Sequence, residues 1–497
     1  MHNNDIWLAG YDDKGKIYVK GDHIEREIRP EYASDVMDIF GLYKKYNLEN
    51  IGIVKTDIGI GVNVLRHEKH LISYPFEWTA NMYKNAVLFH LNLFLKLDKH
   101  ELTLKDALPN NIVFDYCKPI FVDFLSLIKK SSLGGESWLM KGKYNTEPRF
   151  TVFDVMFIPF MLVPFMAMAE KKYYLARRML SDQACNCGGD SPHWKDVYSG
   201  SLLEYGLWSK AIILHLIKKI LMKHSDLPVF PRQTTRISRL LSLTKKTNFI
   251  NYCSQLIQFV DSVDVTPPKS GYLSYYDDKG EKFDLSDQAC WQNKQKAIAK
   301  IIDSEKPGTM LDIGANTGWF SILAAWRGIK VISTDVDESS IDTLYTYSKK
   351  HQLQILTLLI SFNDMTRKIF GIDCGDSKYS DRNFNATPLY LPATERLKSD
   401  MVLCLGLLHH LVLGDGISIS NIFIVLSELT RKTLIIEYID LEDNLIANDM
   451  SFFNKINNYT NETYNIDIII EQGKKHFMNV ETVSSHPDTR KILVFNK

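Results

Sequence analysis

The chain has no excess of either charge. Its 497 residues include 59 Lys and Arg and 59 Asp and Glu, which give a formal net charge of zero. This balance gives no clear signal for nucleic acid or for another strongly charged partner. Hydrophobic residues make up 45% and charged residues 24%, as in globular proteins. At roughly 100–200 residues per domain, such a chain is long enough for two to four domains.

Cysteine is scarce and scattered. The seven cysteines suggest no disulfide framework, and the close pair Cys185 and Cys187 has no matching Cys or His pair at zinc-ligand spacing. The first residues, MHNNDIWLAGYDDKGK, lack a basic region followed by an apolar core, so we read no signal peptide there. We therefore predict no zinc site and a cytoplasmic protein.

Long hydrophobic runs are also missing. The run VMFIPFMLVPFMAMA, Val155–Ala169, is shorter than the ~20 residues of a transmembrane helix. Pro159 and Pro164 would interrupt its helical hydrogen bonds. We predict a buried, kinked helix, and the alternative is a peripheral contact with a membrane or an acyl chain.

One segment has local charge of a single sign. Leu227–Val260 contains no acidic residue, and Arg232, Arg236 and Arg239 would share one face of a helix. A solvated face is the favoured interpretation. The alternatives are a site for a phosphorylated acceptor, a nucleotide or an anionic membrane.

The pattern of apolar residues divides the chain into three parts. Residues 1–125 alternate strand and helix patterns, residues 126–262 are mainly helical, and a Pro- and Gly-rich stretch opens residues 263–497. The last part alternates short apolar strands with amphipathic helices. That alternation predicts an α/β fold with an open, mostly parallel sheet.

A strand, a glycine-flanked turn and a helix form the most informative motif. The strand TMLDI (Thr309–Ile313) is followed by Gly314 and Gly318, and Asp335 ends the next strand, 21 residues after Gly314. Glycine lets a ligand approach the backbone and the free amides of the helix start. A carboxylate at the second strand end suits the two hydroxyls of a ribose. Because the middle glycine of a dinucleotide fingerprint is absent, a nucleoside without a diphosphate fits better than NAD.

The stretch LDIGANTGWFS with STDVD resembles class I S-adenosylmethionine (SAM)-dependent methyltransferases, which have a Rossmann-like fold. The resemblance implies that Asp335 binds the ribose of S-adenosyl-L-methionine and that Asp364 or Asn363 approaches the adenine. It places Asp312 and Gly314 at the methionine end, with Asn316 and Gly318 nearby. The segment CWQNKQKAIAKII resembles the lead-in helix of some members, which implies that Trp291, Lys294 and Gln295 lie near the cofactor cleft.

Two adjacent histidines follow the predicted fourth strand. His409 and His410 lie where ligands bind in such sheets, and a neutral imidazole can remove a proton from an acceptor near pH 7. We predict a catalytic role and prefer His410 to His409. The alternative is that one ring packs in the core and the other only shapes the pocket.

The segment LKDALPNNIVFDYCKPIFVDF contains a second motif. Asp106 and Asn111 are five residues apart, and Asp123 follows a short strand pair. This arrangement resembles the catalytic and metal-binding loops of kinases and implies ATP and Mg²⁺ as ligands, with Lys55 as the candidate phosphate-pairing lysine. A degenerate kinase-like module is the first interpretation, active phosphotransfer the second, and a turn with capping residues the third.

The whole chain resembles a group of bacterial two-part proteins, some described as nodulation-protein-like, which join a kinase-like half to a class I methyltransferase. We therefore expect a methyltransferase that acts on a small molecule or glycan, by O-methylation, with a kinase-like α+β module for substrate binding or scaffolding. Two alternatives stay open. One is a bifunctional kinase-methyltransferase, and the other is a SAM-binding scaffold protein without catalysis.

Overall fold

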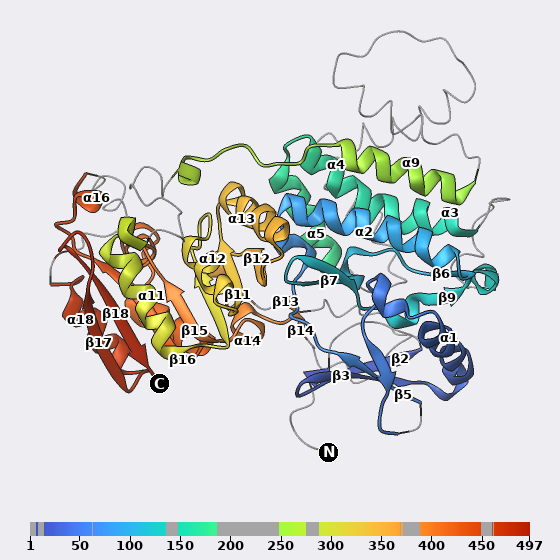
Figure 1. The fold of residues 1–497 in the computed structure, drawn as a ribbon, viewed down its shortest axis with the longest axis horizontal. Helices are drawn as coiled ribbons and strands as arrows, with labels where there is room; N and C mark the ends of the chain where they lie inside the picture. The colour runs from blue at the N-terminus through green and yellow to red at the C-terminus, as the bar shows by residue number, and fades with distance from the viewer. Residues whose placement is uncertain are drawn as a thin grey trace, which may run out of the picture.

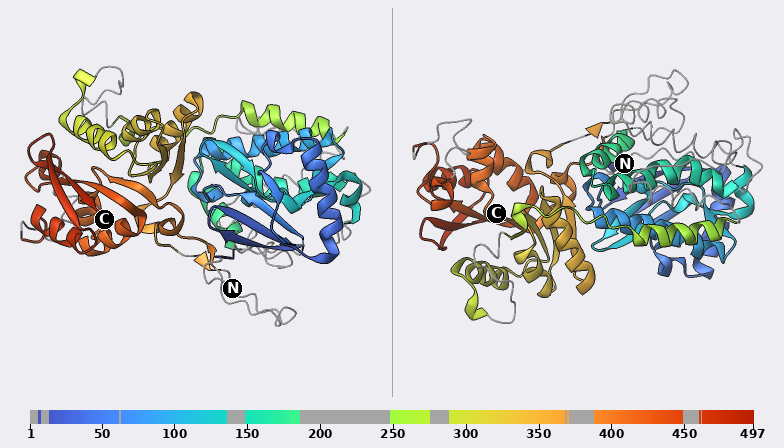
Figure 2. Two further views of the ribbon diagram at one scale, coloured as in Figure 1. Left: turned by 60° about the horizontal axis from the view of Figure 1, so that its bottom comes forward. Right: turned by 90° about the horizontal axis from the view of Figure 1, so that it is seen from above.

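The computed structural model describes residues 14–61, 63–135, 148–185, 248–274, 288–367, 388–448 and 462–497, with 6–7, 369–370 and 460. These residues form two halves that lie side by side (Figures 1 and 2). The predicted basic face of Arg232, Arg236 and Arg239 lies outside the described residues.

An antiparallel sheet and one helix begin the N-terminal half. The strands have the order β1-β2-β3-β5-β4, and α1 (Ala33–Lys45) comes between β3 and β4 in the chain. The helix buries Val36, Ile39 and Tyr43, a spacing that gives it one apolar face. The strand bounds are β1 (Ile6–Trp7), β2 (Gly15–Lys20), β3 (His23–Ile28), β4 (Thr56–Ile58) and β5 (Val64–Glu68).

Helix α2 (Ala80–Asp98) and two short strand pairs follow. The Thr79 hydroxyl accepts a hydrogen bond from the Met82 amide and caps α2. Strand β6 (Leu102–Leu104) pairs with β9 (Leu127–Lys129), so this pairing crosses the predicted boundary at residue 125. Strand β7 (Ile112–Asp115) pairs with β8 (Lys118–Phe121).

The described part of the middle region is helical. It consists of α3 (Pro148–Val152), the π-helical stretch η7 (Phe153–Leu162), α4 (Val163–Ala169), α5 (Tyr173–Cys185) and α9 (Phe249–Ser262). The apolar run at 155–169 thus lies in a helix, where Phe157, Met161 and Phe165 are buried. Among the described residues, no helix is both long and apolar enough to cross a membrane.

A seven-stranded sheet of order β12-β11-β10-β15-β16-β18-β17 forms the centre of the C-terminal half. The first five are parallel, and β18 runs antiparallel between β16 and β17. The result is the predicted Rossmann-like α/β domain with a closing hairpin. The strands are β10 (Thr309–Ile313), β11 (Lys330–Asp335), β12 (Ile355–Leu359), β15 (Ser399–Cys404), β16 (Thr430–Ile439), β17 (Asn479–Ser484) and β18 (Arg490–Asn496).

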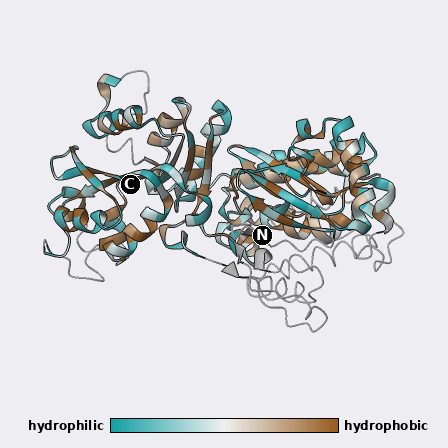
Figure 3. Ribbon diagram, turned by 90° about the horizontal axis from the view of Figure 1, so that it is seen from below, coloured by the Kyte–Doolittle hydropathy of each residue, from teal (hydrophilic) through white to brown (hydrophobic). Residues whose placement is uncertain are grey.

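Helices cover this sheet, and Figure 3 shows hydrophobic residues along its strands. Strands β10 and β15 are almost wholly buried, as expected for parallel strands covered on both faces. The helices are α11 (Asn293–Glu305), α12 (Trp319–Trp326), α13 (Glu338–His351), α14 (Ala393–Arg396), α15 (Ile419–Leu429), α16 (Asn444–Ala447) and α18 (Ile466–Lys474); β13 (Ile369–Phe370) pairs with β14 (Pro388–Tyr390).

Buried polar contacts join the two halves. The backbone amide and side-chain amide of Asn81 both donate to the carboxylate of Asp342, at 2.9 and 2.7 Å. Arg396 forms an ion pair with Glu77, in which the two side chains are 5% and 6% exposed. Helix α2 therefore packs against α13, the helix that follows the predicted ribose-binding strand end.

Candidate functional site

The turn between β10 and α12 requires glycine at both of its ends. Gly314 and Gly318 have φ values of +72° and +83°, in the left-handed region that favours glycine. A Cβ on Gly318 would lie 2.4 Å from a methyl group of Leu344. The amides of Gly314 and Ala315 donate to the carbonyl of Thr334, at 2.8 and 3.0 Å. These bonds hold the turn against the end of β11.

Asp335 lies at the end of β11, beside this turn. Its Oδ2 accepts from the Asn316 amide at 2.6 Å, and its Oδ1 accepts from the Asp337 amide at 2.8 Å. Burial raises the pKa of Asp335, while these two amides lower it. Because each carboxylate oxygen can accept a second hydrogen bond, the fixed carboxylate retains the capacity to accept two hydroxyls.

Asp312 is turned toward α12. It is only 3% exposed, and its Oδ2 accepts from the Ser321 hydroxyl at 2.6 Å. Burial raises the pKa of Asp312 to about 6. The side chain therefore links β10 to α12.

Trp291 lies two residues before α11 and Lys294 in its first turn, and both are 5% exposed. The Trp291 ring meets the Trp319 ring edge-on, with 5.2 Å between centroids. The Lys294 ammonium pairs with the Glu437 carboxylate at 2.7 Å. Desolvating two charges is costly unless they pair closely, so Glu437 on β16 fixes the position of Lys294.

Asp364 is more exposed than the other predicted cofactor residues. It ends the short helix η10 (Phe362–Asp364) after β12, and its amide donates to the Ser361 hydroxyl at 3.3 Å. Its side chain is 53% exposed and lies beyond the same edge of the sheet as Asp335.

His409 and His410 follow β15, and their ring centroids are 4.2 Å apart. His409 is buried, and His410 is half-buried. Burial lowers the pKa of both imidazoles, so both are neutral near pH 7. His410 is the more accessible of the two for a substrate.

Val336 is a residue that the sequence analysis missed. It lies between Asp335 and Asp337 and is 68% exposed, so it presents an apolar surface beside the carboxylate. The available signal was the apolar residue within the Asp-Val-Asp sequence at the end of a strand.

The three predicted kinase-type residues lie on loops that meet. The Val122 amide donates to the Asn111 carbonyl at 2.8 Å, so Asn111 lies close to the loop that carries Asp123. The Ser126 hydroxyl donates to the Asp106 carbonyl at 3.3 Å. The loops after β6, before β7 and after β8 thus converge at one place.

Arg26 is a second residue that the sequence analysis missed. It lies on β3, is 3% exposed, and its Nη1 pairs with Asp123 Oδ1 at 3.2 Å. Lys55, the predicted phosphate-pairing lysine, is exposed instead. Arg26 and Asp123 are 97 residues apart, so no local motif joins them.

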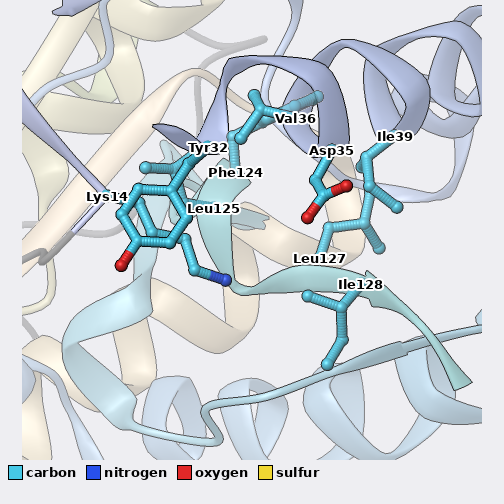
Figure 4. A pocket seen from close by; sticks show the side chains of 9 residues that line it. All are labelled: Lys14, Tyr32, Asp35, Val36, Ile39, Phe124, Leu125, Leu127 and Ile128. Carbon is cyan, nitrogen blue, oxygen red and sulfur yellow. The ribbon is translucent and has the colours of Figure 1, made fainter. Parts of the chain in front are cut away.

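A small open hollow lies between α1 and β9. Figure 4 shows Lys14 and Asp35 at its edge, with apolar side chains around them. Phe124, the residue after Asp123, contributes to its wall. No predicted site residue lines it. Its lining residues are Lys14, Tyr32, Asp35, Val36, Ile39, Phe124, Leu125, Leu127 and Ile128.

Within the described part of the chain, no group of three or more His, Cys, Asp or Glu residues is placed to hold a metal ion. The three predicted kinase-type residues, Asp106, Asn111 and Asp123, are not such a group, because they contribute two carboxylates and one side-chain amide.

No protein-family profile matches the chain. Over 393 residues it is 23% identical to nodulation protein NoeA of Rhizobium meliloti (strain 1021), covering 76% of this chain and 70% of that protein. It is similar to magnesium protoporphyrin IX methyltransferase (ChlM) from Synechocystis PCC 6803 with bound SAH, at 14% identity and a TM-score of 0.27, over 41% of this chain and 83% of that one. It is also similar to the bifunctional kinase-methyltransferase WbdD, at 12% identity and a TM-score of 0.29, over 45% of this chain and 41% of that one. At scores this low the similarities carry no weight for function, and the fold is defined by its own strand order.

Proposed function

We propose that this protein is a SAM-dependent methyltransferase that acts on a small molecule or glycan, at an oxygen atom. One observation carries the proposal. The glycine turn of β10–α12 and the carboxylate of Asp335 meet at adjoining strand ends and are fixed to each other by the Asn316 amide, at 2.6 Å from Asp335 Oδ2. Ligands bind at such strand ends in open α/β sheets.

The residues at this crevice fit an adenosyl group. Gly314 and Gly318 leave the backbone bare, the Asp335 carboxylate can accept ribose hydroxyls, and the exposed Val336 offers an apolar face for a base. Asp364 extends the polar rim. Lys294 is already paired with Glu437, and the buried Asp312 accepts from Ser321, so both side chains serve to hold the surrounding elements in place.

S-adenosyl-L-methionine supplies a sulfonium methyl group for an in-line displacement. The chain contributes alignment and a water-poor pocket, which lower the barrier of such a displacement. The neutral imidazole of His410 is the side chain that we assign to accept the proton of an acceptor hydroxyl, because its pKa is lowered by burial and it is more accessible than His409. His409 orients that ring through the 4.2 Å ring contact.

Calorimetric titration with SAM tests the cofactor site. We expect the wild-type protein to bind SAM and Asp335→Asn to bind it about 10- to 100-fold more weakly, since hydrogen bonds to a charged acceptor are lost. The control is Asp57→Asn, which alters an exposed aspartate of the N-terminal half and leaves SAM affinity unchanged. A wild-type protein with no SAM affinity would refute the proposal.

For the N-terminal half we propose a kinase-like module that binds substrate or serves as a scaffold. Support comes from the converging loops of Asp106, Asn111 and Asp123. The five-stranded sheet with one helix between β3 and β4 places Arg26 on the third strand, facing Asp123. In kinases a basic residue on the third strand pairs with nucleotide phosphates.

The second candidate function is a bifunctional kinase-methyltransferase, favoured by the ion pair between the buried Arg26 and the half-buried Asp123. Thermal unfolding with ATP and Mg²⁺ tests it. If this candidate is correct, ATP with Mg²⁺ raises the thermal unfolding midpoint of the wild-type protein. It leaves the midpoints of the variants Asp123→Asn and Arg26→Met unchanged. A wild-type midpoint that ATP and Mg²⁺ leave unchanged would eliminate phosphotransfer and leave the substrate-binding or scaffold role.

A scaffold protein without catalysis is the third candidate. It predicts SAM binding without transfer of a labelled methyl group to any component of a cell extract. Transfer that depends on His410 would exclude it.

A further inference from the structure

A segment outside every predicted motif connects the two halves. Val263–Ser274 leaves α9 and runs across to a short helix, η8 (Gly271–Ser274), near the start of α13 (Figure 1). Helix α9 packs along α2 in the N-terminal half. The segment therefore begins on one half and ends at the cofactor crevice of the other.

The N-terminal half holds the first part of this segment. The Tyr173 hydroxyl donates to the carbonyls of Val265 and Thr266, both at 3.0 Å. The Lys171 ammonium donates to the Thr266 carbonyl at 2.7 Å and pairs with Asp264 at 3.1 Å. Val265 is 1% exposed, so the backbone here is fixed by both packing and hydrogen bonds.

The last part of the segment is bound to both cofactor loops. The Ser270 hydroxyl donates to Oδ2 of Asp337 at 2.7 Å, and Asp337 follows Asp335 by two residues. The side-chain amide of Asn316, which lies in the glycine turn, donates to the Tyr272 carbonyl at 2.8 Å. A segment tied to both loops at once lies over the strand ends where we place the cofactor.

Tyr272 presents an aromatic side chain at this place. It is 57% exposed, and Val336 on the facing loop is 68% exposed. Large apolar side chains left in solvent beside a binding crevice are candidates for ligand contact. An aromatic ring stacks on a nucleobase irrespective of hydrogen-bond pattern.

We propose that Tyr272 is a cofactor-contacting residue, whose ring covers the adenosyl group, and that Lys171 and Tyr173 position it from the N-terminal half. This inference rests on the proposed SAM-dependent function. It makes the N-terminal half part of the cofactor site, although that half supplies only the anchors of the segment.

Calorimetric titration with SAM and with S-adenosylhomocysteine tests the contact. We expect Tyr272→Ala to weaken both affinities about tenfold or more, because base–aromatic stacking contributes about 1–3 kcal/mol. Tyr272→Phe keeps the ring and stays close to wild type. The matched control is Tyr174→Ala, which removes a tyrosine that is 74% exposed on α5 and leaves both affinities unchanged.

A double-mutant cycle tests the positioning role. Tyr173→Phe removes the hydroxyl that holds Val265 and Thr266, and we expect it to weaken SAM binding about threefold or more with little change in the thermal midpoint. If Tyr173 acts through Tyr272, the double variant Tyr173→Phe/Tyr272→Ala binds no more weakly than Tyr272→Ala alone. Fully additive losses would overturn the positioning role.

The failures of the two proposals are distinguishable. A wild-type protein without SAM affinity overturns the proposed function and this inference with it. A wild-type protein that binds SAM, with Tyr272→Ala within twofold of it, overturns this inference alone.

Discussion

At the scale of single residues, burial sets the charge state of several side chains. His90 on α2 is 0% exposed and lies among the rings of Phe94, Phe121 and Phe157. Burial lowers its pKa to about 3. Within the described part of the chain neither ring nitrogen has a hydrogen-bond partner. Between a pH of about 3 and a pH of about 6.5, the native protein therefore keeps neutral an imidazole that the unfolded chain would protonate.

The substitution His90→Leu should reduce the loss of stability in acid. A histidine whose folded pKa is depressed stabilises the fold above its unfolded pKa of about 6.5, and this contribution is lost as pH falls toward the folded value. With a folded pKa of about 3, wild type should lose about 2 kcal/mol more than the variant between pH 8 and pH 5. Urea unfolding followed by intrinsic fluorescence at both pH values measures the difference.

His351→Leu is the control, because His351 is exposed. Its acid sensitivity should match wild type. Equal acid sensitivity of His90→Leu and wild type would show that His90 is not the buried neutral group that the structure places in this aromatic cluster.

At the scale of elements, the β10–α12 turn is the part of the site most readable from sequence. Two glycines around Ala-Asn-Thr after an apolar strand predict the turn, because each glycine stands where the backbone takes a positive φ. Asp335 follows from the same local logic, at the end of the next strand. The hydrogen bond from the Asn316 side-chain amide to the Tyr272 carbonyl could not be predicted, because the two residues are 44 positions apart and no sequence pattern links them.

Gly318→Ala and Gly328→Ala should differ in both stability and SAM affinity. Both positions have a left-handed backbone, with φ of +83° and +80°, which costs an alanine about 1–2 kcal/mol. An added Cβ at Gly328 meets no atom within 4 Å, whereas at Gly318 it would meet the buried Leu344 at 2.4 Å. Only Gly318→Ala should therefore move α12 and α13 apart.

Thermal unfolding and SAM titration of the two variants check this expectation. Gly328→Ala should lower the midpoint and bind SAM as wild type does. Gly318→Ala should lose more stability and about tenfold or more in affinity, in line with loss of hydrogen bonds to the cofactor. Equal effects of the two substitutions on affinity would contradict the role of the turn.

At the scale of the whole molecule, the contacts between the halves were beyond sequence reasoning. The sequence predicted an α/β C-terminal domain from periodicity, and the seven-stranded sheet confirms it. Pairs such as Asn81 with Asp342 and Glu77 with Arg396 join positions far apart in the chain. These pairs depend on how the helices and strands pack against one another, so neither residue spacing nor composition in the sequence indicates them.

Arg396→Ala should destabilise the junction of the two halves. Glu77 would remain as a buried charge without its ion-pair partner, which typically costs 3–5 kcal/mol. The Arg396 guanidinium also donates to the Ile72 carbonyl at 2.7 Å and lies 4.5 Å from the centre of the Tyr74 ring. The free energy of unfolding in denaturant measures the loss.

The double variant Glu77→Gln/Arg396→Met removes both charges and serves as the matched comparison. It should recover most of the stability that Arg396→Ala loses, since no buried charge is left alone. A double variant as unstable as Arg396→Ala would assign the loss to packing instead.

The docking of the halves has a further consequence at the rim of the large sheet. Strand β12 forms one of the two edges of the sheet, and η3 (Pro75–Glu77) lies against it. The Cys117 thiol donates to the carbonyl of Leu353, just before β12, at 3.0 Å. An uncovered edge strand has unpaired backbone amides and carbonyls that can pair with a strand of a second copy. A shortened chain starting near residue 288 would uncover this strand edge, so we expect it to polymerise where the 497-residue chain stays dispersed.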